Sequence, residues 1–350
     1  MTDYGIHFGL DEDEYHSVPC MSASGIKKIL ISAKDFWDES WMNPDKPVQE
    51  KKACLDFGKA VHSFVLEPET IGKYAPEFKG NEDSLKTVAD MKEWLDSNAI
   101  AYKSSDAKPK LTSTILAADP DAPIFERQQV AYNLKNSDKT LLPPNDFDKL
   151  SLMEKLISQE KDFLQYFEGG VSEVSFFVKC PFTGIKIKSR FDYLSLHMSD
   201  LKTFSRKSRA PLKILAKNEF LYNRYDIQWF TYMMARDEAF KSIKNGQSQV
   251  FGDVNREWVD YLIDNSNDRF AFGFIESSRP YNTFKLEMEK WRVPGEETNM
   301  LYNHAQDSYE KGVRKFVYYM DKYGPNTPWP EEDNYLKLTD KDVPLYFFEN

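Results

Sequence analysis

Two aspartates and a lysine stand close together near the middle of the chain. Asp200 and Lys202 are two positions apart in "SDLKTF", a short segment whose alternation predicts a β-strand. Because side chains alternate along a strand, these two share one face. Asp192 ends the preceding predicted strand, and a tight turn near residues 195–198 would bring it beside Asp200. Paired carboxylates suit Mg²⁺ or Mn²⁺ holding a phosphate, and a lysine can orient or activate a water or stabilise charge on that phosphate.

An ordinary ion pair on an exposed hairpin has the same Asp-x-Lys spacing, so other residues must decide between the two interpretations. Glu173 falls on the first predicted strand of the same sheet, and His62 falls on an early predicted helix. Further along, Tyr225, Gln228 and Tyr232 are spaced to share one face of a helix. Each also has a plain structural interpretation, His62 as a core residue and the tyrosines as core aromatics with polar tips.

The elements that must position these residues change character along the chain. Helical patterns come first, over 22–37 and in "ACLDFGKAVHSFVLEP", which ends at a proline. Alternating segments that predict strands follow at 172–180, 184–196 and 199–204. A long helical pattern then covers about 211–243. A late pair of strands at 269–277 and 282–289 precedes a closing helix at about 296–322. Strands that alternate with helices predict an α/β or α+β fold, with a central mixed sheet flanked by helices and a helical N-terminal part.

The segment 85–118 differs from its surroundings. It combines two helical patterns with a polar turn and a short extended piece, and it resembles the helix–extended–helix modules of the SAP type, which often bind DNA. A plain helical hairpin has the same apolar skeleton and stays an alternative. Residues 119–148 are rich in Asp, Pro and Asn and are typical of a linker or long loop. We therefore expect a helical part at 1–80, an inserted module with its linker at 81–148, and the core at 149–350.

Taken together and in order, the motifs resemble the PD-(D/E)xK nuclease superfamily, in particular its RecE-type and RecB-type exonuclease branch. The resemblance rests on five short motifs: Gly58-x-x-x-His62, the strand glutamate Glu173, Arg190-x-Asp192, Asp200-x-Lys202-Thr203 and Gln228-x-x-x-Tyr232. The opening "YHSVPCMSASGIKKIL" also resembles the family's pre-core helix, and "FIESSRPYNTFKLEM" and "TPWP" resemble its late strands and tail. It extends over most of the chain outside about 80–150. One departure is the short link between Asp192 and Asp200, which a hairpin accommodates.

The resemblance implies a role for each matching residue. Metal ligands would be His62, Asp192, Asp200 and the backbone carbonyl of Leu201, with Glu173 as a further ligand or a carboxylate that orients water. Lys202 would be the catalytic amine. DNA contacts are expected from the aromatic and amide face and from the basic segment that follows the third strand, namely Tyr225, Gln228, Tyr232, Arg206, Lys207 and Arg209.

Composition limits the kinds of protein that the chain can be. The net charge of −10 argues against a uniformly basic coat, yet the stretch from Lys202 to Lys217 holds six bases and no acid, which suits a DNA phosphate backbone. The three cysteines have no paired spacing, so neither a disulfide framework nor an iron–sulfur site is expected. The acidic first 16 residues and the lack of a long apolar window predict a cytoplasmic protein with no membrane partner.

The resemblance implies a Mg²⁺-dependent 5′→3′ exonuclease on linear double-stranded DNA, with Mn²⁺ as a substitute. The resemblance further implies phage or prophage origin, a bacterial host cytoplasm, a homo-oligomeric ring (trimer or tetramer) and a RecT-like single-strand annealing partner that uses the 3′ overhangs. Two alternatives remain open. One is another nuclease of the superfamily, either a single-strand exonuclease or an endonuclease. The other is a DNA-binding protein without catalysis.

Overall fold

A computed structural model describes residues 3–46, 53–206, 208–293 and 297–331. The chain forms two compact units, one made of residues 1–50 and 162–350 and the other of residues 51–161. The predicted domain division at residues 80 and 148 stays a prediction.

The first unit is built on a seven-stranded mixed sheet. Its strand order is β7 (Gln249–Phe251), β1 (Gly5–His7), β4 (Val171–Lys179), β5 (Lys186–Leu194), β6 (Met198–Phe204), β8 (Arg269–Glu276) and β9 (Thr283–Glu289). The pairs β1–β7 and β6–β8 are parallel, and the other neighbours are antiparallel. The mixed sheet and the five longer strands confirm the prediction. Strands β1 and β7 were not predicted, because three residues are too few to show a period of two.

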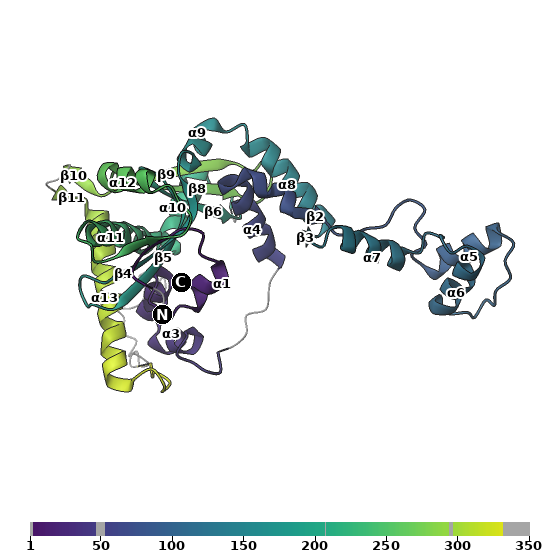
Figure 1. The fold of residues 1–350 in the computed structure, drawn as a ribbon, viewed down its shortest axis with the longest axis horizontal. Helices are drawn as coiled ribbons and strands as arrows, with labels where there is room; N and C mark the ends of the chain where they lie inside the picture. The colour runs from purple at the N-terminus through teal and green to yellow at the C-terminus, as the bar shows by residue number, and fades with distance from the viewer. Residues whose placement is uncertain (1–2, 47–52, 207, 294–296, 332–350) are drawn as a thin grey trace, which may run out of the picture. The chain divides into compact units, whose positions relative to one another are not determined.

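Helices cover both faces of this sheet (Figure 1). On one face, α11 (Tyr225–Lys244) packs on β4 and β5, with α13 (Met300–Tyr323) and α2 (Ala23–Ile31) packed against α11. Large aromatic side chains of the strands point toward α11, as the contact of Phe191 with Tyr232 shows. On the other face, Phe163 and Phe167 of α9 (Lys161–Leu164) and η2 (Gln165–Phe167) lie against Gly273 of β8, where a larger side chain would collide with them.

Two predicted helices are each divided in the structure. The pattern over 211–243 forms α10 (Leu212–Tyr222) and α11, which are separated at Arg224, a residue in the left-handed conformation with φ 50°. The pattern over 22–37 forms α2 and α3 (Ala33–Glu39), because the Ser32 hydroxyl accepts from the Asp35 N–H and starts a new helix. The remaining elements of this unit are α1 (Glu12–Ser17), α12 (Arg256–Asn265), β10 (Trp291–Val293) and β11 (Glu297–Thr298).

The second unit contains helices and one small parallel strand pair. Its elements are α4 (Ala53–Leu66), η1 (Pro68–Lys73), β2 (Tyr74–Pro76), α5 (Val88–Ser97), α6 (Lys108–Ala118), α7 (Phe125–Lys135), β3 (Thr140–Leu142) and α8 (Pro144–Ile157). The predicted helix–extended–helix segment is α5 and α6, which share a small core that includes Met91, Leu95 and Leu111. The expectation of a long loop over 119–148 is wrong, because α7, β3 and the start of α8 lie there, whereas the alternative of a linker stays a prediction. Helix α7 buries none of its residues and therefore lacks the apolar stripe by which a helix is recognised.

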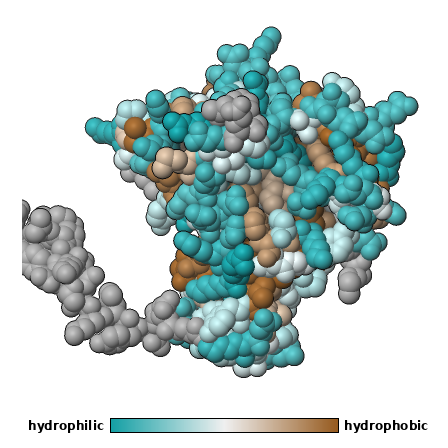
Figure 2. Space-filling model, turned by 90° about the vertical axis from the view of Figure 1, so that its left-hand side faces the viewer, coloured by the Kyte–Doolittle hydropathy of each residue, from teal (hydrophilic) through white to brown (hydrophobic). Residues whose placement is uncertain are grey.

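Hydrophobic residues are mostly buried. Figure 2 shows one face of the molecule, on which hydrophilic residues predominate and hydrophobic residues gather in small patches. Across the described ranges, every helix is either too short or too polar to cross a membrane.

Candidate active site

The site begins where strands β5 and β6 separate. The predicted tight turn is present, with the Ser195 N–H donating to the His197 carbonyl at 2.9 Å. The two strands pair only at Tyr193–Ser199 and Leu194–Met198. Beyond these pairs the Asp192 carboxylate accepts from the Leu201 N–H at 2.7 Å, in place of a backbone partner. The backbone pairing of the two strands thus stops, and the Asp192 side chain bridges them instead.

Asp200 lies in the middle of β6 and is held by two partners. Its carboxyl group is only 1% exposed. Oxygen Oδ1 accepts from Gln228 Nε2 at 2.6 Å, and Oδ2 forms an ion pair with the Lys202 ammonium. The predicted shared face of Asp200 and Lys202 is therefore present, and Gln228 of α11 fixes the direction of the carboxylate.

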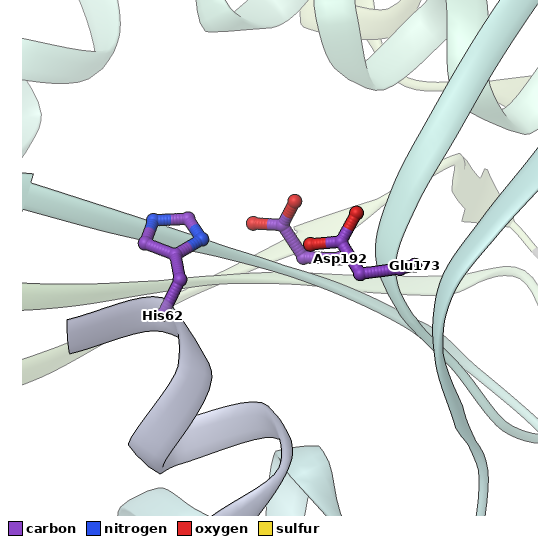
Figure 3. Close-up of side chains that lie close together, drawn as sticks. All are labelled: His62, Glu173 and Asp192. Atoms are coloured by element: carbon purple, nitrogen blue, oxygen red, sulfur yellow. The ribbon is translucent and has the colours of Figure 1, made fainter. Parts of the chain in front are cut away.

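Glu173 lies on β4 opposite Asp192, since the flanking pairs are Ser172–Tyr193 and Val174–Phe191. Its backbone has φ 54°, an uncommon and strained conformation for a residue with a Cβ atom. The side chain accepts a hydrogen bond from Arg190 Nε at 2.5 Å. Carboxylate oxygens of Glu173 and Asp192 come within 4.8 Å of each other, and Figure 3 shows the two groups side by side.

The negative charges of the carboxylates in this cluster are not fully balanced by the neighbouring cations. Burial and the nearby Glu173 charge raise the pKa of Asp192 to about 6, although Lys202 acts in the opposite direction. Burial disfavours the charged form of Lys202, but the attraction of Asp200 and Asp192 outweighs it and raises the pKa of Lys202. Lys202 is therefore an ammonium ion at neutral pH and cannot serve as a general base in this arrangement.

These side chains fit a hard divalent cation. The available donors are carboxylate oxygens from neighbouring strands, which Mg²⁺ and Mn²⁺ prefer. A bound cation would also offset the repulsion that raises the pKa of Asp192. In an extended strand the N–H and C=O of one residue point to the same side. The Leu201 carbonyl therefore faces the space beside Asp192, as its N–H does.

His62, the remaining predicted ligand, belongs to the second unit. It is half-buried on α4, in the predicted spacing of four residues from Gly58, and is the third residue labelled in Figure 3. Its role as a ligand stays a prediction.

The predicted DNA contacts fall into three groups. Gln228 and Tyr232 lie on the buried side of α11, where Gln228 hydrogen-bonds Asp200, and Tyr225 begins the same helix. Arg206 is bound by the buried Glu276 through two hydrogen bonds of 2.7 and 3.2 Å, so its charge is already balanced. Arg209 is exposed. Lys207 lies outside the described residues, and DNA contact by all of these residues stays a prediction.

One cation near the site was missed by the sequence analysis. The Lys27 ammonium, from α2, lies 4.8 Å from the centroid of the Tyr225 ring, and the Lys202 ammonium lies 5.2 Å from the same centroid. Lys27 and Lys28 are adjacent in a helical pattern, and that pattern does not show which of the two faces the site. Only the packing of α2 beside α11 turns Lys27 toward the site.

Comparison with known proteins agrees with this geometry. Residues 22–257 match the model of a family described as "PDDEXK-like domain of unknown function (DUF3799)". The chain belongs to this family. A search of curated proteins finds no match.

Two solved structures are similar over much of the chain. One is a "Putative exonuclease" from Eubacterium rectale, with 13% identity and a TM-score of 0.48 over 96% of this chain and 92% of the other. The second is SSO0001, with 11% identity and a TM-score of 0.23 over 75% of this chain and 85% of the other.

The family and the mixed sheet place the chain in the PD-(D/E)xK superfamily, as predicted. Membership supports a nuclease that hydrolyses phosphodiesters with the help of a divalent metal ion.

Proposed function

We propose that this protein is a Mg²⁺-dependent deoxyribonuclease that degrades linear double-stranded DNA from its 5′ ends. One observation supports the nuclease assignment, namely that Glu173, Asp192, Asp200 and Lys202 converge where β5 and β6 separate. The preference for linear duplex and for 5′ ends comes from the resemblance. An ion pair on an exposed hairpin would leave the aspartate in water. Here Asp200 is buried and held by Gln228 and by Lys202, whose ammonium group is also attracted by Asp192.

The metal site is proposed to consist of Asp192, Asp200 and the Leu201 carbonyl, with Glu173 as a further ligand or a carboxylate that orients water. The Gly58–His62 spacing on α4 supports His62 as an additional ligand. When bound, Mg²⁺ or Mn²⁺ would supply an acidified water and polarise the phosphodiester.

The protein's own groups supply the remaining chemistry. Lys202, as an ammonium ion, stabilises negative charge that develops on the phosphate. Gln228 donates to Asp200 and holds that carboxylate in one orientation. Tyr225, Gln228 and Tyr232 position the DNA strand, and the exposed Arg209 attracts its backbone, together with the predicted contacts of Arg206 and Lys207.

The biological setting follows from the resemblance to RecE-type exonucleases. Digestion would leave 3′ overhangs for a RecT-like single-strand annealing partner in a bacterial cytoplasm, and the gene would be of phage or prophage origin. A ring of three or four copies around the DNA fits an acidic protein whose sequence holds six bases and no acid from Lys202 to Lys217. The segment 85–118 would contact DNA or serve as a spacer.

Digestion of end-labelled DNA tests the proposal. With Mg²⁺, the expected result is loss of linear duplex from its 5′ ends, with closed circles intact and single strands digested slowly. Asp200→Ala should be folded and inactive, and Arg314→Ala, at an exposed ion pair of α13, serves as the matched control. Cleavage of circles would indicate an endonuclease, preference for single strands a different exonuclease, and binding without cleavage a DNA-binding protein.

A further inference from the structure

Two lysine ammonium groups lie against one tyrosine ring beside the carboxylates. Lys27 and Lys202 are 4.8 and 5.2 Å from the centroid of the Tyr225 ring, so they are at most about 10 Å apart. Phe272 stacks on this ring with a centroid distance of 5.4 Å and an interplanar angle of 23°. Phe272 covers one face of the Tyr225 ring, so the two ammonium groups approach the part of the ring that Phe272 leaves uncovered.

This arrangement is unfavourable for Lys27 when the site is empty of substrate. The side chain is half-buried, and burial together with the repulsion of Lys202 lowers the pKa of Lys27 to about 8. Asp200 and Asp226 attract it, but Lys202 already pairs with Asp200, and Arg224 pairs with Asp226 through hydrogen bonds of 3.0 and 2.9 Å. The nearby carboxylates are thus engaged by other cations, whereas an anion arriving between the two lysines would be stabilised by both.

We infer that Lys27 is a substrate-contacting residue, whose ammonium binds a non-bridging oxygen of the phosphate next to the one that is cut. This inference rests on the proposed nuclease function, and it extends that function to a residue to which the resemblance assigns no role. Lys202 acts at the cut phosphate, and the separation of at most about 10 Å places Lys27 within reach of the neighbouring phosphate. The Tyr225 ring holds both ammonium groups in place.

Lys28 provides a matched control. It is the next residue of α2, it carries the same charge, and it forms an ion pair with Glu39 on the surface. Lys27→Met removes the charge and keeps an unbranched side chain on the ring, Lys27→Arg keeps the charge, and Lys28→Met removes a charge elsewhere. Lys27→Gln is the second neutral variant if the methionine variant does not fold.

The measurement is the affinity for a short DNA duplex over a range of salt concentrations, with Ca²⁺ replacing Mg²⁺ to prevent cleavage. Lys27→Met is expected to weaken binding about 10- to 100-fold, the effect of one charged hydrogen bond. The slope of log affinity against log salt should become less negative by about 0.7 to 0.9, the share of one phosphate contact. Lys28→Met should change neither quantity, and Lys27→Arg should restore most of both.

Each result has a clear meaning. An unchanged slope and affinity for Lys27→Met, with a wild-type protein that binds and cuts DNA, overturns the inference and leaves the proposed function intact. A lysine that only packs on the ring would alter thermal stability without altering the slope, and that result also overturns the inference. A wild-type protein that neither binds nor cuts DNA with Mg²⁺ or Mn²⁺ refutes the proposed function and removes the basis of the inference.

Discussion

The buried ion pair between Asp200 and Lys202 should cost stability when either partner is removed alone, and little when both are removed. Asp200→Asn keeps an oxygen that can accept from Gln228 but leaves the Lys202 ammonium with Asp192 as its remaining partner. Since 20% of the Lys202 side chain is exposed, we expect a loss of about 2 kcal/mol in the free energy of unfolding. Lys202→Met leaves a carboxylate that is 1% exposed, and we expect a loss of about 3 kcal/mol.

The double variant removes both charges, so its free energy of unfolding should lie within about 1 kcal/mol of the wild-type value. The assay is equilibrium unfolding in urea with EDTA present, followed by tryptophan fluorescence. The exposed pair of Lys28 and Glu39 is the control cycle, for which the coupling should stay below about 1 kcal/mol. If the effects of the two single variants add to within about 0.5 kcal/mol, the two charges are not coupled and the description of the site is wrong. All three site variants should be inactive as nucleases, including the stable double variant.

Four further outcomes are expected. Because a metal ligand must be ionised, affinity for Mn²⁺ should fall about tenfold from pH 7 to pH 5 as Asp192, with a pKa of about 6, takes up a proton; calorimetry that shows less than a twofold change would contradict this. Gln228→Ala should weaken DNA binding more than metal binding, and equal DNA affinity in wild type and variant would refute its role in positioning the strand. Lys188→Met should lower the free energy of unfolding by about 2–4 kcal/mol, because the buried ammonium donates to three carbonyls at the end of α1; an unchanged urea midpoint would argue against these bonds. Removal of 85–118 should reduce DNA affinity in a gel-shift titration if α5 and α6 contact DNA, and no change would make them a spacer.

The central strands and their charged residues were predictable because their signals are local. Alternation over seven to nine residues defined β4, β5 and β6, and the short turn between the last two could only form a hairpin. The placement of Asp192 beside the strand that carries Asp200 followed from that hairpin alone.

Other features depend on tertiary contacts and left no local pattern. Strand β1 is only three residues long and is defined by its neighbours β4 and β7. The division between α10 and α11 depends on the left-handed backbone of Arg224, which the residue type does not reveal. Lys27 differs from Lys28 only through the packing of α2 beside α11. Arg206 is bonded to Glu276, which lies 70 positions away in the sequence. The basic run from Lys202 to Lys217 therefore did not show which of its charges are already balanced.

The backbone of Glu173 has a consequence for how this protein can change over time. At φ 54°, the backbone of a glycine or asparagine would be less strained than that of a glutamate, by a conformational free energy of about 1–3 kcal/mol. Selection for higher stability of the folded protein therefore favours replacing Glu173, whereas selection for the proposed nuclease activity favours keeping it. A descendant released from the need for catalysis should lose this glutamate early, since a single substitution would relieve the strained backbone while leaving the sheet intact.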